Sequence, residues 1–112
     1  MVSRKELLDK FHAVYDKDSF GALEKSMRPQ FCQRIADYTK KGGGIVYVVV
    51  KKKADDHPQR YTGPPYSVSR DDLMELTNFG SAFDHVVSLG KVYDLSIPGM
   101  TQTGHILKRM LR

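Results

Sequence analysis

Cysteine is almost absent from this sequence of 112 residues, and tryptophan is absent altogether. The single cysteine, Cys32, cannot form a disulfide within the chain, so nothing in the sequence indicates an oxidising compartment. Free cysteines are usually small, buried apolar side chains, and no histidine stands near Cys32 in the sequence to act as its base. We therefore expect Cys32 to pack in the core.

Long hydrophobic runs are also missing. The longest one, residues 45–50, has six residues, whereas a membrane-spanning helix needs about 20. The chain becomes charged at Arg4-Lys5-Glu6, which is unlike the apolar stretch of a secretory signal. These absences predict a protein that is cytoplasmic or otherwise intracellular, that is not secreted and that has no membrane partner.

Motifs that carry chemistry are scarce. No Cys-x-x-Cys and no Gly-x-Ser-x-Gly motif occurs, and no two histidines stand three or four residues apart. The glycines at 42–44 follow a predicted helix and precede a predicted strand, which is the reverse of the order in a phosphate-binding loop. We therefore predict no metal, no cofactor and no catalytic residue.

What the chain does contain suits a small globular protein. Its hydrophobic content of 40% includes eleven aromatic residues, which is enough to build a core, and its length predicts one domain over residues 1–112. The formal net charge is +5. Residues 71–98 are acidic on balance while the rest is basic, an asymmetry that favours association with an acidic partner.

Three helices are predicted in the first 40 residues. Ser3 and Glu6 form a capping box, and the apolar residues after them step by three or four, so we expect a helix from residue 3 to about residue 16. The same spacing continues beyond it. It predicts a short helix over 19–26 and a longer one over 27–40, with Gly42 ending the second.

The rest of the chain alternates strands and helices. Residues 45–50 do not alternate in polarity, so they predict a central strand buried on both faces. Short strands are expected at 60–62, 66–68 and 91–97. Helices are expected after the capping signals at Ser69 and Ser81 and over the last ten residues. The predicted fold is therefore α+β, in the order α-α-β-β-α-β-α, with about three mainly antiparallel strands packed by helices.

Basic and aromatic residues are the strongest functional signal in the sequence. Nucleic-acid sites combine cations that contact phosphates with aromatic rings that stack on bases. The same residues also fit a solvated surface in which lysines protect a hydrophobic strand from aggregation. The candidate nucleic-acid-binding residues are Lys40, Lys41, Lys51, Lys52, Lys53, Arg60, Tyr61, Tyr66, Arg70, Lys108, Arg109 and Arg112.

Three functions are compatible with these features. The first hypothesis is a non-enzymatic module that binds RNA or DNA through a basic surface. The second is a small regulator or subunit that binds another protein or associates with itself through apolar residues of its helices. The third is a small enzyme, for which no constellation of residues stands out. Neither the partner nor the oligomeric state follows from the sequence.

Overall fold

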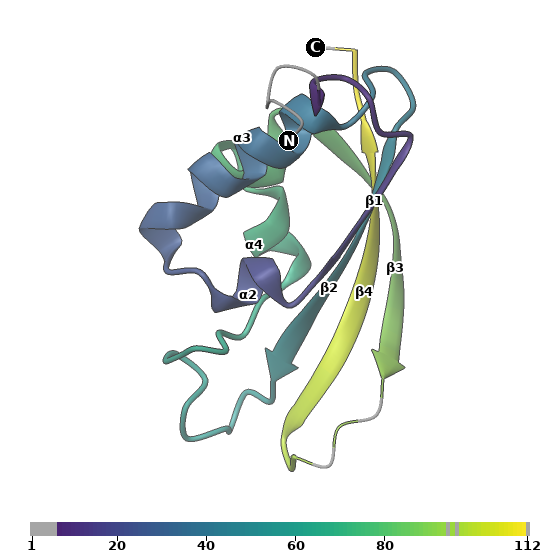
Figure 1. Ribbon diagram of the computed structural model, residues 1–112. Helices are drawn as coiled ribbons and strands as arrows, with labels where there is room; N and C mark the ends of the chain where they lie inside the picture. Colours follow the sequence, from purple (N-terminus) through teal and green to yellow (C-terminus); the bar gives the residue numbers. More distant parts are fainter. Residues whose placement is uncertain (1–6, 94, 96, 112) are drawn as a thin grey trace.

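The computed structural model describes residues 7–93, 95 and 97–111, and it shows a mixed four-stranded sheet with helices on one face (Figure 1). The sheet has the strand order β1-β2-β4-β3. In chain order the elements are β1 (Ala13–Lys17), α2 (Ser19–Ala22), η1 (Lys25–Met27), α3 (Arg28–Tyr38), β2 (Ile45–Lys53), α4 (Arg70–Met74), η2 (Leu76–Gly80), β3 (Phe83–Tyr93) and β4 (Met100–Arg109).

β2 is a central strand, as its sequence predicted. It pairs in parallel with β1 and antiparallel with β4. Val46, Val48 and Val50 are completely buried beneath the helices, and Val49 is completely buried on the other face. Ile45, at the start of the strand, remains 39% exposed. The valines of β2 therefore form the centre of the core, although Ile45 is only partly buried.

Helices α3 and α4 close this core from one side. Cys32 and Ala36 of α3 are buried against the valines of β2, which confirms Cys32 as a packing residue. Burial raises the pKa of its thiol to about 12. The ring of Phe79 packs between two others, 5.8 Å from Phe20 and 5.5 Å from Phe83 between ring centroids. Among the described residues, no helix is long and apolar enough to cross a membrane.

The capping signal at Ser69 was interpreted correctly. The hydroxyl of Ser69 accepts a hydrogen bond from the backbone N–H of Asp72, whose carboxylate accepts one from the N–H of Ser69, and α4 begins there. The predicted break at 78–80 is also present, since Asn78 has a non-helical backbone within η2. Gly42 adopts a left-handed conformation (φ 78°) beyond the end of α3.

The predicted N-terminal helix is wrong over residues 13–17. Residues 13–17 form β1, which pairs in register with the first residues of β2, from Ala13 opposite Ile45. The proposed cap at Ser3 and Glu6 lies outside the described residues. Apolar residues three and four apart fit a helix, but a parallel partner far along the chain supplies hydrogen bonds that no local pattern reveals.

The C-terminal third also differs from the prediction. The helices expected after Ser81 and over the last ten residues are instead β3 and β4, and no strand forms at 60–62 or 66–68. β3 contains register shifts against β4, one of them next to Gly90 (φ 70°), which interrupted the sequence pattern. The α+β class is thus confirmed, but the sheet has four strands and is mixed rather than three-stranded and antiparallel.

Candidate functional site

The candidate site lies at the carboxyl ends of the parallel strands β1 and β2. Ligands of open α/β sheets bind outside the carboxyl ends of such strands, where loops and helix starts bring polar groups together. In this chain β1 ends at Lys17 and is followed directly by α2, while β2 ends at Lys53 and is followed by the long connection 54–69. The backbone N–H of Tyr66 in that connection donates to the carbonyl of Gly21 in α2, which joins the two ends.

Asp16 is the most unusual residue at the end of β1. It is 7% exposed, and its Oδ2 is the only buried side-chain oxygen or nitrogen of the described residues without a hydrogen-bond partner. Burial raises the pKa of Asp16, although hydrogen bonds from the Ser19 hydroxyl and the Phe20 amide oppose the shift. A buried carboxylate oxygen without a donor is costly, which makes it a candidate acceptor for a ligand's proton or N–H.

Asp18 holds the connection between β1 and α2 in place. Its backbone is left-handed (φ 70°), and its carboxylate lies 2.9 Å from the ammonium of Lys51 and accepts a 2.8 Å hydrogen bond from Gln102. Lys51 belongs to β2 and Gln102 to β4. Contacts with β2 and β4 therefore fix the position of the turn that follows β1.

A pair of tyrosines flanks the same end of the sheet on the face that carries no described helix. The hydroxyls of Tyr15 and Tyr93 are 3.1 Å apart, and this hydrogen bond raises the pKa of Tyr15 to about 12. The ammonium of Lys17 lies 4.4 Å from the centre of the Tyr93 ring. Both rings remain exposed, Tyr15 by 57% and Tyr93 by 42%, so they offer aromatic surface to a planar ligand.

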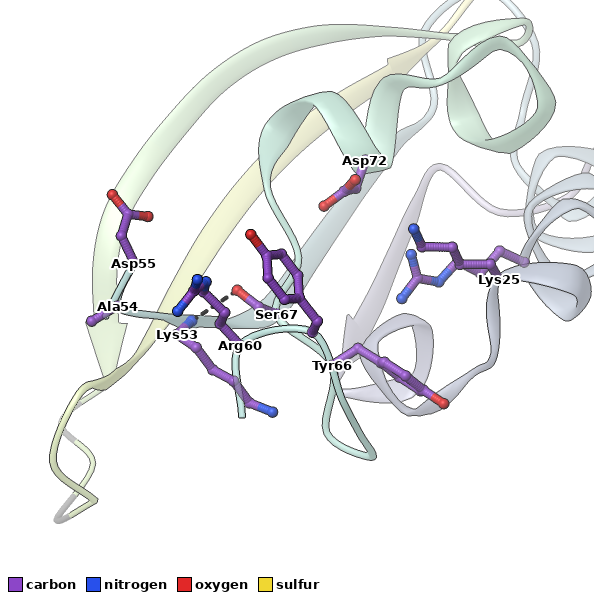
Figure 2. Close-up of a pocket in the computed structure, with 10 residues that line it drawn as sticks. Lys25, Lys53, Ala54, Asp55, Arg60, Tyr66, Ser67 and Asp72 are labelled. Carbon is purple, nitrogen blue, oxygen red and sulfur yellow. Dashed lines mark hydrogen bonds between the residues drawn. The ribbon is translucent and has the colours of Figure 1, made fainter. Parts of the chain in front are cut away.

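A cavity of about 590 Å³ adjoins the end of β2. Figure 2 shows that its labelled residues come from η1, from the end of β2, from the following connection and from α4. The lining carries four cationic side chains, two carboxylates and two tyrosines, together with Ala54 and Ser67; the charged and aromatic residues are Lys25, Arg28, Lys53, Arg60, Asp55, Asp72, Tyr61 and Tyr66.

The basic residues selected from the sequence do not form one surface. Lys51, Lys52 and Lys53 follow the buried part of β2, whereas Lys40 and Lys41 precede that strand at its opposite end. Lys52 and Arg70 line a smaller cavity of about 220 Å³. Lys108 is exposed near the end of β4, and Arg112 lies outside the described residues.

Two of the selected residues are internal. Arg109 is 5% exposed and donates to the carbonyls of Ala36, Ala82 and Met110, so it holds α3 against the end of the sheet and does not face a ligand on the surface. Lys53 is also 5% exposed. The selected residues that the structure does bring together are Lys53, Arg60, Tyr61 and Tyr66, which all line the 590 Å³ cavity.

The sequence interpretation missed several residues of the site, which are Tyr15, Asp16, Asp18, Lys25 and Arg28. The acids at 16 and 18 stand directly between a strand and a helix, and that order is a recognisable signal of a ligand site in an α/β sheet. The order of strand and helix around these acids was not recognised, because residues 13–17 were assigned to the end of a helix.

The protein-family comparison decides the family of the chain. A family model described as "Thiopurine S-methyltransferase (TPMT)" matches residues 2–99. The chain belongs to the thiopurine S-methyltransferase family. The hypothesis of a non-enzymatic module that binds nucleic acid is therefore wrong, because the family that the chain matches is one of S-methyltransferases.

Relatives of the thiopurine S-methyltransferase family support this assignment. The chain is 36% identical over 70 residues to a thiopurine S-methyltransferase of Photobacterium profundum, in an alignment of 62% of this chain and 30% of the relative. It is 34% identical over 70 residues to the enzyme of the same name from Vibrio vulnificus, with the same shares of each chain. The chain thus spans about 30% of the length of these relatives.

Solved structures show the same fold. One is from a study of the conversion of a disulfide bond into a thioacetal group during echinomycin biosynthesis; it matches 98% of this chain and 53% of its own, with a TM-score of 0.67 and 10% identity. The other is TehB from Haemophilus influenzae, with a TM-score of 0.60, 14% identity and coverage of 98% and 40%. At these identities the likeness concerns the fold alone.

A methyltransferase requires a methyl donor, ordinarily S-adenosylmethionine, and part of this site fits such a molecule. The orphaned Oδ2 of Asp16 can accept a hydrogen bond from a molecule bound at this end of the sheet. No glycine-rich turn leads from a strand into a helix within 7–93, since Gly42, Gly43 and Gly44 lie between α3 and β2. The described residues therefore offer a methyl donor one polar group, Asp16, at this end of the sheet.

Proposed function

We propose that this chain contributes to the active site of an S-methyltransferase whose acceptor is the thiol of a small heteroaromatic compound, such as a thiopurine. The family match over residues 2–99 is the observation that carries the proposal. The buried, unpartnered carboxylate oxygen at the end of β1 supports it, because ligands of such sheets bind at that end.

Asp16 has a defined role in this proposal. When bound, S-adenosylmethionine supplies an electrophilic methyl group on a sulfonium sulfur. The acceptor loses its proton as its sulfur forms the new bond to carbon, so a proton acceptor beside that sulfur speeds the transfer. Because burial raises the pKa of Asp16, its carboxylate is a stronger proton acceptor than an ordinary aspartate.

The test is methyl transfer from S-adenosylmethionine to 6-mercaptopurine, measured by mass spectrometry of the S-methyl product. We expect Asp16→Asn to lower kcat by about 100-fold, the usual effect of losing a positioned proton acceptor. The matched control is Glu24→Gln, which removes an exposed carboxylate beside η1 and should leave kcat unchanged. A protein that neither forms the product nor binds the thiopurine in an NMR titration would contradict the proposal.

A further inference from the structure

We propose that His85, Ser88 and His105 form a binding site for a divalent transition-metal ion, such as Zn²⁺ or Ni²⁺, between the strands β3 and β4. The proposal goes beyond methyl transfer and does not depend on it. β3 is the edge strand opposite β1, which carries Asp16. The sequence predicted no metal because no two histidines stand three or four residues apart, whereas the structure pairs two histidines that are 20 residues apart.

Strand pairing brings these side chains onto one face of the sheet. β3 and β4 are antiparallel neighbours (Figure 1), and their register places His85 opposite Leu107 and Ser88 opposite His105. Residues three apart on a regular strand point to opposite faces, but a register shift between His85 and Val87 adds one residue to β3. Directly opposite residues share a face, so His85, Ser88 and His105 all lie on the face of the buried Leu107.

The three donor atoms form a triangle of the size that one metal ion requires. Nε2 of His85 is 3.1 Å from Nδ1 of His105, and the Ser88 hydroxyl is 3.3 Å from the first nitrogen and 3.1 Å from the second. Imidazole nitrogens bind zinc at about 2.0–2.1 Å, so two ligands are about 2.9 Å apart at right angles and about 3.3 Å apart in a tetrahedron. All three separations fall in this range.

The outer nitrogens of the two rings have partners of their own. Nε2 of His105 lies 3.4 Å from the hydroxyl of Thr103. The ring of His85 makes a hydrogen bond to its own backbone, which a histidine reaches through Nδ1. Contacts of this kind hold the ring N–H on the outer nitrogen, fix the orientation of the ring and leave the facing nitrogen to bind a metal.

The surroundings of the two rings also suit a metal ion. Burial is the main cause that lowers the pKa of both imidazoles, so their lone pairs are available at neutral pH. Ser88 and His105 line the 220 Å³ cavity, which gives an ion a path and leaves room for a water ligand. No cysteine or carboxylate of the described residues completes a larger cluster around the two histidines. Imidazole ligands without thiolate suit zinc, copper and nickel.

Two cations of the same lining, Lys52 and Arg70, oppose the binding of a metal ion. Both side chains are exposed, so water and salt screen their charges, whereas the three donors act at contact distance. The repulsion nevertheless has a sign that can be measured. Removing the charge of Arg70 should favour the ion.

The test is a titration of the chain, free of any histidine tag, with ZnCl₂ and separately with NiCl₂, followed by calorimetry and by thermal unfolding. MgCl₂ is the control, because Mg²⁺ prefers oxygen ligands. We expect one Zn²⁺ or Ni²⁺ ion per chain and a melting temperature that rises with its concentration, since the ion binds the folded state. Equal binding of Mg²⁺, or no saturable binding of either transition metal, would overturn the proposal.

Matched variants locate the ion. His85→Gln replaces a half-buried ring, so the fold should persist while the affinity for Zn²⁺ falls by more than about tenfold. His12→Gln is the control, because His12 is exposed and precedes β1 at the other edge of the sheet; it should leave the affinity within about twofold. Equal weakening by the two variants would overturn the proposal.

Two further variants test the third donor and the repelling charge. Ser88→Ala changes an exposed residue and should weaken binding severalfold, because it removes one of three donors. Arg70→Gln should bind the ion at least as tightly as the unchanged chain, because it removes a positive charge from the lining. An unchanged affinity for Ser88→Ala, or weaker binding by Arg70→Gln, would overturn the three-donor site.

Discussion

At the scale of single residues, Asp16 combines a cost to stability with a position in the candidate site. Its carboxylate is buried with one oxygen unpartnered, so the folded state favours the protonated form and the pKa is raised above the ordinary value of 3.8. Residues held in this way are common where a protein binds a ligand, because the ligand supplies the missing partner.

The pH dependence of stability follows from that shift. A carboxyl group with a raised pKa in the folded state contributes its full stability below pH 3.8 and loses it as the pH rises through the folded-state pKa. We therefore expect Asp16→Asn to raise the free energy of unfolding at pH 7, and this gain to shrink as the pH is lowered toward about 4. Urea denaturation at several pH values measures it. A gain that is the same at every pH, or one that Glu24→Gln reproduces, would contradict this account.

Arg109 stabilises the fold, whereas the buried carboxylate of Asp16 lowers its stability. Its guanidinium connects the carbonyls of α3 with residues that precede β3 and follow β4. Replacing it with Met leaves buried carbonyls unsatisfied, and we expect a loss of about 2–3 kcal/mol in the free energy of unfolding. Lys108→Met is the matched control, because Lys108 is the exposed neighbour on the same strand. Equal urea midpoints for the two variants would show that Arg109 is not structural.

At the scale of elements, β2 was predictable and β1 was not. The valines of β2 identify a buried strand by composition alone, and Ser69 with Asp72 identifies the start of α4 through a cap that is local in sequence. β1 depends on pairing with a distant segment, and β3 and β4 depend on pairing with each other. Val14 and Tyr15 fit the spacing of a helix equally well, so only the partner strand decides their conformation.

The buried position of Val48 in β2 gives a direct test of that element. Val48→Thr keeps the shape of the side chain but buries a hydroxyl, which should lower the free energy of unfolding by about 1–3 kcal/mol. Ile45→Thr, on the same strand but 39% exposed at its start, should cost clearly less. Thermal and urea unfolding of both variants measure the difference. Similar losses would contradict the difference in burial between Val48 and Ile45.

At the scale of the whole molecule, net charge was a poor guide to function. Lys40 and Lys41 stand before β2 and Lys51–Lys53 end it, and a strand of this length keeps them about 30 Å apart. Lys53 is turned inward, and so is Arg109. The part of the candidate site that could be predicted was the group of Lys53, Arg60, Tyr61 and Tyr66. Arg28, which lines the same cavity, was not selected, because nothing in the sequence shows that this arginine is buried.

The parallel pairing of β1 with β2 has a consequence for how the molecule assembles. β3 and β4 follow one another along the chain and can zip together from a short connection, whereas β1 reaches β2 only across α2, η1 and α3. Closing that larger loop costs chain entropy, which is recovered only when α3 has docked. We therefore expect the candidate-site end of β1 to form later than the β3–β4 hairpin, and a substitution that weakens α3 to disturb the site before it disturbs that hairpin.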